Sequence, residues 1–280
     1  MPAIATTIDE LRAKIATLRD GGARLGFVPT MGALHEGHVS LVHETRNHAD
    51  RVIVSIFVNP TQFAPHEDFD RYPRTLESDA EKLFAAGGTD LIFAPAVGEM
   101  YPDGFATRIE VGGPSQGLES DIRPHFFSGV ATVVAKLLLA VMPDVATFGE
   151  KDYQQLLVVR RLAADLGLAT EILGAPIIRE SDGLAMSSRN AYLSAFERQV
   201  AGQLNLVLKQ VHGMLRGGAA IAAAEEAGKR ALLEAGFGSV DYVAVRDATS
   251  LAALAVLDRP ARVLAAATVG KTRLIDNMAV

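Results

Sequence analysis

Short apolar runs alternate with amphipathic stretches between residues 25 and 166. Residues 25–28 form an apolar run that ends in a turn-forming Pro-Thr-Met-Gly, and residues 52–58 form a β-branched run typical of a strand buried on both faces. Further strands are predicted at 91–93 and 145–148, and helices at 8–18, from near 35–37 to 49, at 78–86, 130–141 and 152–166. This alternation predicts an α/β fold, a Rossmann-like doubly wound parallel sheet with helices on both faces.

The pattern changes near residue 176. Two Ala- and Leu-rich helices are expected at 195–216 and 219–235, followed by strands at 240–245 and 262–268. We therefore predict two domains, residues 1–175 with the parallel sheet and residues 176–280 with a smaller α+β fold.

Composition narrows the classes of function. The chain has 280 residues, a net charge of -6 and no cysteine, which argues against a broad nucleic-acid-binding face and excludes disulfides, thiolate zinc sites and a cysteine nucleophile. The longest apolar stretch, 130–141, contains Lys136 and is too short for a membrane span. Charged residues appear from Asp9 onward, unlike in a signal peptide. A cytoplasmic enzyme or binding protein is expected, with no membrane partner.

The sharpest chemical cluster is His35-Glu36-Gly37-His38. Two histidines three positions apart share one face at a predicted helix start, where free backbone N–H groups and the helix dipole attract an anion. A solvated helix start and a metal-binding pair are the alternatives, although the spacing is not that of a His-Glu-x-x-His zinc motif.

Two further segments have the composition of phosphate sites. Gly149-Glu150-Lys151-Asp152 lies between a predicted strand and a helix, and Met186-Ser187-Ser188-Arg189 combines hydroxyl donors with a guanidinium. Taken alone, the first could be a charged helix cap and the second an N-cap. Asp79 could be an ordinary first-turn acid of its helix, or could hold magnesium if that helix end faces phosphates.

Several segments together identify a resemblance. They are 29–38 (Pro-Thr-Met-Gly-Ala-Leu-His-Glu-Gly-His), 59–63 (Asn-Pro-Thr-Gln-Phe), 72–75 (Tyr-Pro-Arg-Thr), 149–155 (Gly-Glu-Lys-Asp-Tyr-Gln-Gln) and 186–190 (Met-Ser-Ser-Arg-Asn). In this order they resemble the pantothenate synthetase (pantoate-β-alanine ligase) family, over nearly the whole chain. Residues 35–38 are similar to the HIGH signature of the nucleotidyltransferase superfamily, and residues 186–189 to its KMSKS counterpart.

The resemblance implies an ATP-dependent, AMP-forming ligase. Pantoate would attack the α-phosphate of ATP to give pantoyl adenylate and pyrophosphate, and β-alanine would then displace AMP to give pantothenate. Magnesium would accompany ATP, and a homodimer is implied. The C-terminal domain would close over the ATP site, and the loop 60–74 would cover the adenylate.

The resemblance also assigns residues. His38 is the implied catalytic acid, with His35, Lys151 and Arg189 completing the catalytic set, and Gln62 and Gln155 are the implied pantoate ligands. Asp79 is the candidate magnesium ligand. The implied ATP site comprises Met31, Gly32, Ala33, Leu34, His35, Glu36, Gly37, His38, Gly149, Glu150, Lys151, Asp152, Ile178, Met186, Ser187, Ser188 and Arg189.

One segment departs from the family. Where the family usually reads Arg-Pro-Gly-His-Phe-Asp-Gly, residues 123–129 read Arg-Pro-His-Phe-Phe-Ser-Gly, so a histidine is shifted to His125 and an acid becomes Ser128. Other adenylyltransferases and an ATP-sensing binding module are the competing hypotheses. The former transfer AMP to a phosphate and do not need Gln62 and Gln155, and the latter would not need the full set of histidines, lysine, serines and arginine.

Overall fold

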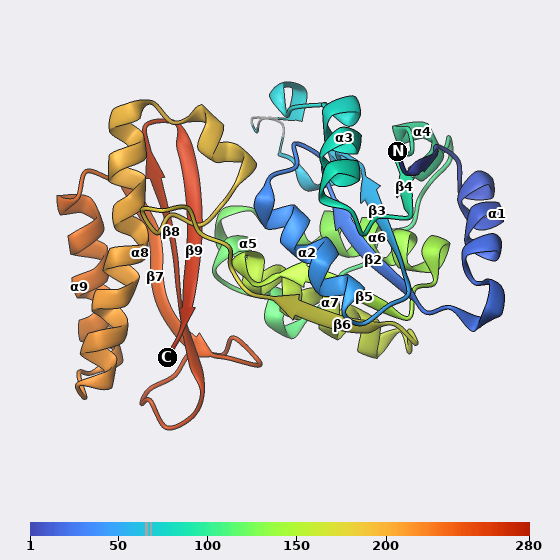
Figure 1. Cartoon of the computed structure of the whole chain (residues 1–280). Coiled ribbons are helices and arrows are strands. Elements are labelled where there is room, and N and C mark those ends of the chain that lie inside the picture. The colour runs from blue at the N-terminus through green and yellow to red at the C-terminus, as the bar shows by residue number, and fades with distance from the viewer. Residues whose placement is uncertain (65–66, 68) are drawn as a thin grey trace. The chain divides into compact units, whose positions relative to one another are not determined.

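The computed structural model describes residues 1–64, 67 and 69–280 (Figure 1). The chain forms two compact units, the first from Met1–Glu150 with Val158–Pro176, and the second from Lys151–Leu157 with Ile177–Val280. Residues Lys151–Leu157 precede the boundary expected near 176 but group with the second unit.

The first unit is built on the parallel sheet that the sequence predicts. Its strand order is β1-β4-β3-β2-β5-β6, and the neighbouring strands pair in parallel. The strands are β1 (Ala3–Ala5), β2 (Leu25–Thr30), β3 (Arg51–Ile56), β4 (Leu91–Phe93), β5 (Val145–Gly149) and β6 (Glu171–Ala175). Strands β1 and β6 were not predicted from the sequence, because these edge strands are short or half-exposed and lack a buried apolar run.

Helices flank the sheet on both sides (Figure 1). They are α1 (Ile8–Leu18), α2 (Glu36–Arg46), α3 (Leu76–Ala86), α4 (Val97–Met100), α5 (Glu119–Ile122), α6 (Phe126–Val141) and α7 (Tyr153–Asp165). The apolar stretch 130–141 is the buried helix α6, whose residues face protein on nearly every side. In the described part of the chain, no helix has the length and apolar character that a membrane span requires.

The topology creates a switch point between β2 and β5. These central strands are neighbours, and the chain continues from β2 to β3 on one side and from β5 to β6 on the other. In doubly wound sheets, ligands bind beyond the carboxyl ends of the strands at such a point. The loops that follow Thr30 and Gly149 are therefore the ones placed for binding.

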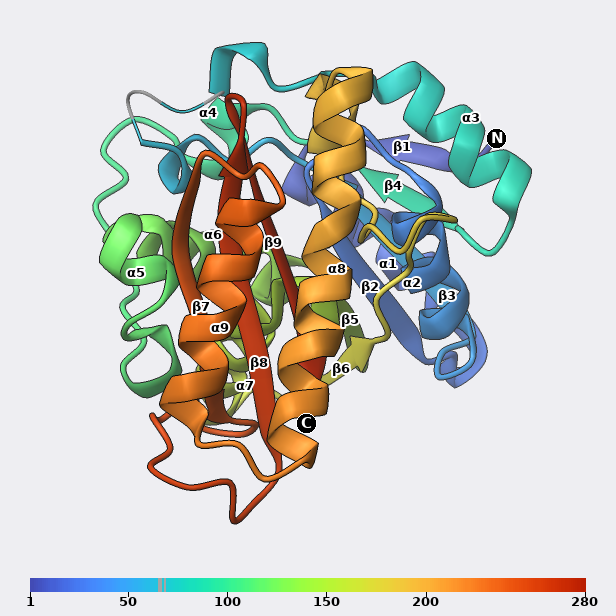
Figure 2. The same cartoon turned by 90° about the vertical axis from the view of Figure 1, so that its left-hand side faces the viewer.

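The second unit packs two helices on a small antiparallel sheet. Strands β7 (Ser239–Asp247), β8 (Ala261–Val269) and β9 (Thr272–Ala279) pair in that order, and α8 (Ala195–Arg216) and α9 (Ile221–Glu234) cover one face of the sheet (Figure 2). Strand β9 was not predicted from the sequence, because buried polar residues such as Asp276 and Asn277 interrupt its apolar alternation. An α+β unit of this kind was expected.

Candidate functional site

The two motif histidines cap the N-terminus of helix α2, where their side chains accept hydrogen bonds from backbone N–H groups of the first turn. His35 is the N-cap residue, and its Nδ1 accepts a hydrogen bond from Gly37 N (3.1 Å), while Nδ1 of His38 accepts one from His35 N (3.3 Å). The ring centroids lie 4.1 Å apart. A neutral imidazole that accepts at Nδ1 carries its proton at Nε2, so the backbone selects the tautomer of both rings. The pair lies at the switch point, where α2 begins.

A carboxylate of helix α3, that of Asp79, binds the turn between β2 and α2. Gly32 has φ +84° and Ala33 φ +50°, and a side chain on Gly32 would press on Oδ2 of Asp79. Asp79 is 2% exposed and accepts hydrogen bonds from Ala33 N (3.0 Å) and Leu34 N (2.8 Å).

Two further side chains from this helix region, Thr75 and Lys82, support the same contact between α3 and the β2–α2 turn. The Thr75 hydroxyl donates to Oδ2 of Asp79 (3.0 Å), and Nζ of Lys82 donates to the Leu34 carbonyl. Asp79 thus fixes the turn that carries Met31 to His35, a role that needs no ion. The magnesium role expected for Asp79 stays a prediction. Among the described residues, no group of three or more His, Asp or Glu side chains could hold a metal.

Gln62 ends the short turn Pro60–Gln62 that follows β3. Its side chain is 8% exposed, its Oε1 accepts from Asn59 Nδ2 (3.1 Å), and its Nε2 lies 2.8 Å from the Met31 sulfur. The structure therefore brings the expected pantoate ligand Gln62 next to the β2–α2 turn. Of the loop 60–74, residues 65, 66 and 68 lie outside the described residues.

The segment 123–129, which departs from the family pattern, supports the turn Pro60–Gln62. The Arg123 guanidinium contacts Glu67 through Nε–Oε1 (2.6 Å) and Nη2–Oε2 (2.8 Å), and Nη2 also donates to the Gln62 carbonyl (3.1 Å). By contrast, His125 Nε2 and Ser128 Oγ are buried without a hydrogen-bond partner in the part of the chain described. Arg123 is thus the anchor here, and the two altered positions add no polar contact at these atoms.

The second unit holds the start of helix α7. Lys151 and Asp152 lie in the turn Glu150–Asp152, with Lys151 Nζ 3.8 Å from Asp152 Oδ2. The Lys151 carbonyl accepts from Asn277 Nδ2 (2.9 Å). Gln155 follows on the first turn of α7, one helical turn beyond Lys151. Residues 151–155 are therefore tied to strand β9.

The segment from Ile178 to Arg189 is anchored on the same strand. Arg179 forms a bidentate pair with Asp276 (2.7 and 2.9 Å), whose side chain is fully buried, and the Ile178 carbonyl accepts from Met186 N (2.9 Å). Ser187 caps the turn Ser188–Tyr192 by accepting from Arg189 N (3.3 Å). The N-cap expected as an alternative for this motif is thus present, and it fixes the turn that carries Ser188 and Arg189.

Several residues that hold the site carry no assigned role in the sequence. Asn59, Tyr101, Asp276 and Asn277 each contact a motif residue or its direct partner. Asp276 and Asn277 have one usable signal, which is their polarity inside an alternating apolar strand. Tyr101 has none, because its contact with Asn59 spans 42 positions.

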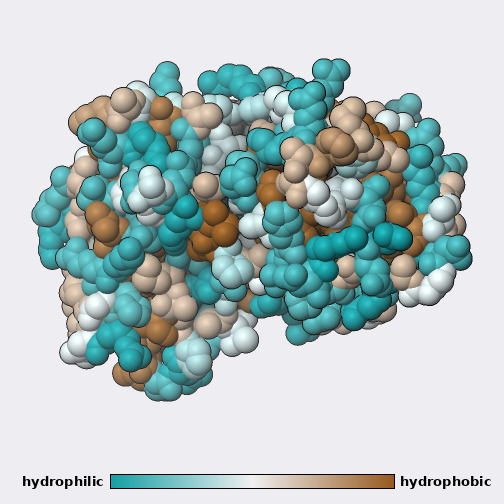
Figure 3. All heavy atoms as spheres, in the orientation of Figure 1, coloured by the Kyte–Doolittle hydropathy of each residue, from teal (hydrophilic) through white to brown (hydrophobic). Residues whose placement is uncertain are grey.

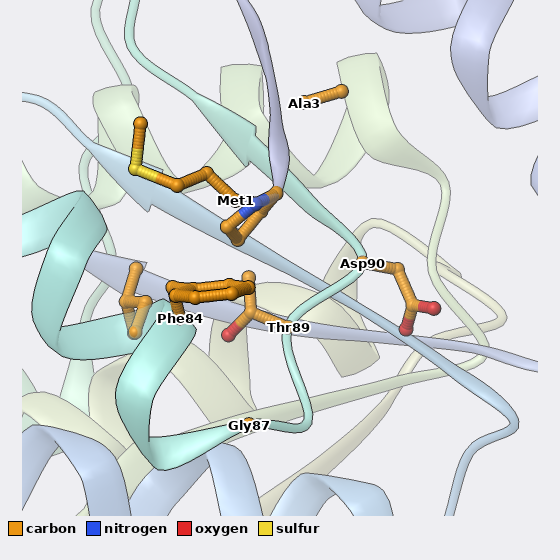
Figure 4. A pocket seen from close by; sticks show the side chains of 8 residues that line it. Met1, Ala3, Phe84, Gly87, Thr89 and Asp90 are labelled. Carbon is orange, nitrogen blue, oxygen red and sulfur yellow. The ribbon is translucent and has the colours of Figure 1, made fainter.

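An open cavity of the first unit lies away from these residues. In Figure 3, hydrophilic residues cover much of the visible face, and hydrophobic ones form scattered groups. A cavity of about 400 Å³ is lined by the first residues of the chain and the end of α3, including Met1, Phe84, Thr89 and Asp90 (Figure 4). No expected site residue lines it.

A doubly wound sheet with two imidazoles at a helix start on its switch point defines a class, the α/β proteins that bind anionic ligands at a strand-to-helix turn. Comparison with known proteins narrows this class. The profile of the pantoate-beta-alanine ligase family matches residues 3–279, and the chain belongs to this family.

Relatives match over their full length. The chain is 57% identical to the pantothenate synthetase of Mesorhizobium japonicum over 277 residues, which cover 99% of this chain and 97% of the relative. A pantothenate synthetase from Thermus thermophilus superposes with a TM-score of 0.92 at 48% identity, covering 99% of this chain and 98% of that one. A pantoate-beta-alanine ligase from Francisella tularensis, complexed with beta-gamma ATP and beta-alanine, has a TM-score of 0.82 at 34% identity, covering 99% and 97%.

Proposed function

We propose that this chain joins pantoate to β-alanine at the expense of ATP, in two steps. In the first, a pantoate carboxylate oxygen attacks the α-phosphorus of ATP, the bond to the β-phosphate oxygen breaks, and pyrophosphate leaves. In the second, the β-alanine amine attacks the acyl carbon of pantoyl adenylate, AMP leaves with the bridging oxygen, and the amine loses a proton. Membership of the family and the binding state of its Francisella tularensis member support this reaction.

The observation that carries the proposal is that both imidazoles accept a backbone hydrogen bond at Nδ1. Because both accept backbone hydrogen bonds at Nδ1, the neutral rings of His35 and His38 carry Nε2–H donors. Such donors, next to the N-terminus of α2, suit phosphate oxygens whose negative charge grows as the α-phosphorus is attacked. On family resemblance His38 is the residue proposed as the acid, and in this tautomer it would act by donating a hydrogen bond from Nε2–H to a phosphate oxygen.

Charged and hydroxyl side chains are proposed to contact the nucleotide. Lys151 and Arg189 would supply positive charge to the phosphates, and Ser187 and Ser188 would supply hydroxyl donors. The remaining contacts of the proposed ATP site come from Met31 to Gly37, Gly149, Glu150, Asp152, Ile178 and Met186.

Gln62 and Gln155 are the proposed pantoate ligands. A neutral amide can orient a carboxylate without the strong charge stabilisation that a salt bridge would give to the ground state of the nucleophile. We expect Gln155→Glu to abolish pantoate binding by charge repulsion while ATP binding remains. Isothermal titration calorimetry measures both, and retained pantoate affinity would contradict this assignment.

Magnesium is proposed to enter with ATP, bound to its phosphates. The donors around Asp79 occupy most of its oxygen lone pairs, so this carboxylate fits a metal poorly and no step is derived through the ion. A homodimer is also part of the proposal, on family resemblance, and sedimentation equilibrium tests it. A cytoplasmic location is proposed because ATP is available there.

Pyrophosphate exchange tests the reaction. The enzyme should incorporate labelled pyrophosphate into ATP only when pantoate is present, and should release AMP when β-alanine is added. His38→Ala should lower the exchange rate by about 100-fold or more. His48→Gln is the matched control, since His48 is a surface residue paired with Glu44. Exchange without pantoate would indicate another adenylyltransferase, and no exchange would favour a binding module.

A further inference from the structure

Asn59 is a buried amide whose oxygen receives several donors. It follows β3 and is 1% exposed. Its Oδ1 accepts from the Tyr101 hydroxyl (2.7 Å), the Thr61 hydroxyl (3.0 Å) and Thr61 N (3.3 Å). A flipped amide would place its NH₂ group against the backbone N–H of Thr61, which can only donate. The backbone N–H of Thr61 therefore fixes the direction of the Asn59 side chain, and the Tyr101 and Thr61 hydroxyls strengthen this orientation by donating to the same oxygen.

The fixed amide in turn sets the direction of Gln62. Asn59 Nδ2 donates to Gln62 Oε1 (3.1 Å) and to the Gly129 carbonyl (3.2 Å). A Gln62 side chain in the opposite orientation would bring two NH₂ groups together. Gln62 therefore keeps its oxygen toward Asn59 and its nitrogen toward Met31, on the side of the β2–α2 turn.

The nitrogen of Gln62 is held against a weak acceptor. Its partner is the Met31 thioether at 2.8 Å, and sulfur accepts hydrogen bonds poorly. A carboxylate or hydroxyl oxygen of a substrate would be a better acceptor than this sulfur. The arrangement therefore offers a donor to an oxygen-bearing ligand.

Tyr101 begins this chain of hydrogen bonds and is itself rigidly placed. Its ring packs against Phe57 (6.2 Å between centroids) and Phe105 (5.1 Å). Burial raises the pKa of the Tyr101 phenol, which outweighs the opposing effect of its contact with Thr61. The hydroxyl consequently stays protonated over the neutral range.

We propose that Tyr101 is a positioning residue for the acid substrate: through Asn59 it holds the Gln62 amide with its nitrogen toward the substrate, so the site selects a carboxylate or hydroxyl oxygen. This inference rests on the proposed function, because it takes Gln62 as a pantoate ligand. Tyr101 itself need not touch the substrate.

The test is steady-state kinetics of three variants, with the KM for each substrate measured separately. Tyr101→Phe keeps the ring and removes one of three donors to Asn59, and should raise the KM for pantoate about 3- to 10-fold. Tyr101→Phe combined with Thr61→Val removes two donors and should raise it further. Asn59→Asp turns the donor to Gln62 into an acceptor, so the Gln62 amide should reverse, and the KM for pantoate should rise by about 100-fold or more.

A purely structural role would give a different result. If these variants only loosened the fold, the KM for ATP and β-alanine would rise in parallel and the melting temperature would fall. We expect the KM for ATP and β-alanine to stay within twofold in Tyr101→Phe. Tyr242→Phe, on β7 of the second unit, is the matched control and should leave the KM for pantoate unchanged.

The outcomes separate the inference from the function on which it rests. An unchanged KM for pantoate in the double variant and in Asn59→Asp, with a wild type that shows pantoate-dependent exchange, overturns the inference alone. A parallel rise of all three KM values also overturns it. A wild type without pantoate-dependent exchange overturns the proposed function and the inference together.

Discussion

The two units hold their expected site residues by different forces. In the first unit, amides, a hydroxyl and backbone N–H groups orient most of these residues, as at Asn59 and Asp79, alongside the ion pair of Arg123 with Glu67. In the second unit, charged pairs do much of this work. Arg179 pairs with buried Asp276, and Arg198 contacts Glu180 (2.8 Å) and Asp182.

The two kinds of contact contribute differently: neutral hydrogen bonds set the direction of a side chain, and buried ion pairs contribute more to the free energy of unfolding when one partner is removed. Neutral hydrogen bonds distinguish donor from acceptor, so they can present one end of an amide to a substrate, and salt screens them little. Ion pairs tolerate more variation in direction, and they depend on pH and, where exposed, on salt. The largest penalty is expected where a buried charge loses its partner. The following variants probe this contrast, from the largest expected effect to the smallest.

Asp276→Asn should have the largest effect. It leaves the Arg179 guanidinium without its bidentate carboxylate and should cost about 3–5 kcal/mol of unfolding free energy. Urea denaturation followed by circular dichroism measures this cost. Asp165→Asn is the control, because the Arg161–Asp165 pair is exposed and should contribute about 1 kcal/mol or less. Equal losses in both variants would contradict the contrast between buried and exposed pairs.

Asp79→Asn should cost about 1.5–3 kcal/mol, because a carboxylate that accepts two backbone N–H groups is lost. The KM for ATP should rise at every magnesium concentration, since the turn that carries His35 loosens. Magnesium titration distinguishes this from the metal-ligand hypothesis. If Asp79 instead holds the ion, excess magnesium should restore the activity and the stability should hardly change.

Gly129→Ala tests the packing of α6 against the Gln62 turn. An added Cβ would lie 2.3 Å from the Thr61 carbonyl oxygen, so the turn must move, at about 1–3 kcal/mol. The KM for pantoate should rise with this movement. Gly213→Ala within α8 is the control, as its Cβ meets nothing within 4 Å and it should stabilise the helix by about 1 kcal/mol. A stabilised Gly129→Ala enzyme with an unchanged KM would contradict this packing.

Asp247 should give the smallest effect, visible only in acid. Backbone hydrogen bonds from Ser250 and Thr249 lower the pKa of Asp247 from 3.8 to about 2. A lowered pKa in the folded state means that this contribution is present above pH 3.8 and is lost as the pH falls toward 2. In Asp247→Asn the melting temperature should therefore fall less steeply between these two pH values than it does in the wild type. An unchanged pH dependence would show that the turn does not stabilise the fold.

The sequence predicted the central elements closely. The β-branched run at 52–58 is the central strand β3, and the helix expected at 195–216 is α8. These elements bury long apolar faces, so their periodicity is strong. Edge strands β1 and β6, and β9 with its buried Asp276, carry weak or mixed patterns.

The candidate site divides in the same way. Motif residues such as His35, His38 and Gln62 stand out in the sequence as site candidates, because the chemistry and the family resemblance lie in short segments. The role of Asp79 as a clamp was not, since its partners Ala33 and Leu34 lie more than 40 positions away. Nor was the attachment of Lys151 to Asn277, across 126 positions.

The amino-acid sequence alone determined the α/β class and the order of the strongly periodic elements, and it predicted which side chains carry the chemistry, because these depend on local periodicity and residue type. Only the tertiary structure decided how those side chains are held. It decided which nitrogen of each imidazole bears the proton, and which end of the Gln62 amide faces the β2–α2 turn. The physical reason is that a hydrogen bond has a direction set by both partners. For Gln62 the decisive donor is Asn59, whose amide oxygen meets the Tyr101 hydroxyl only once the chain has folded.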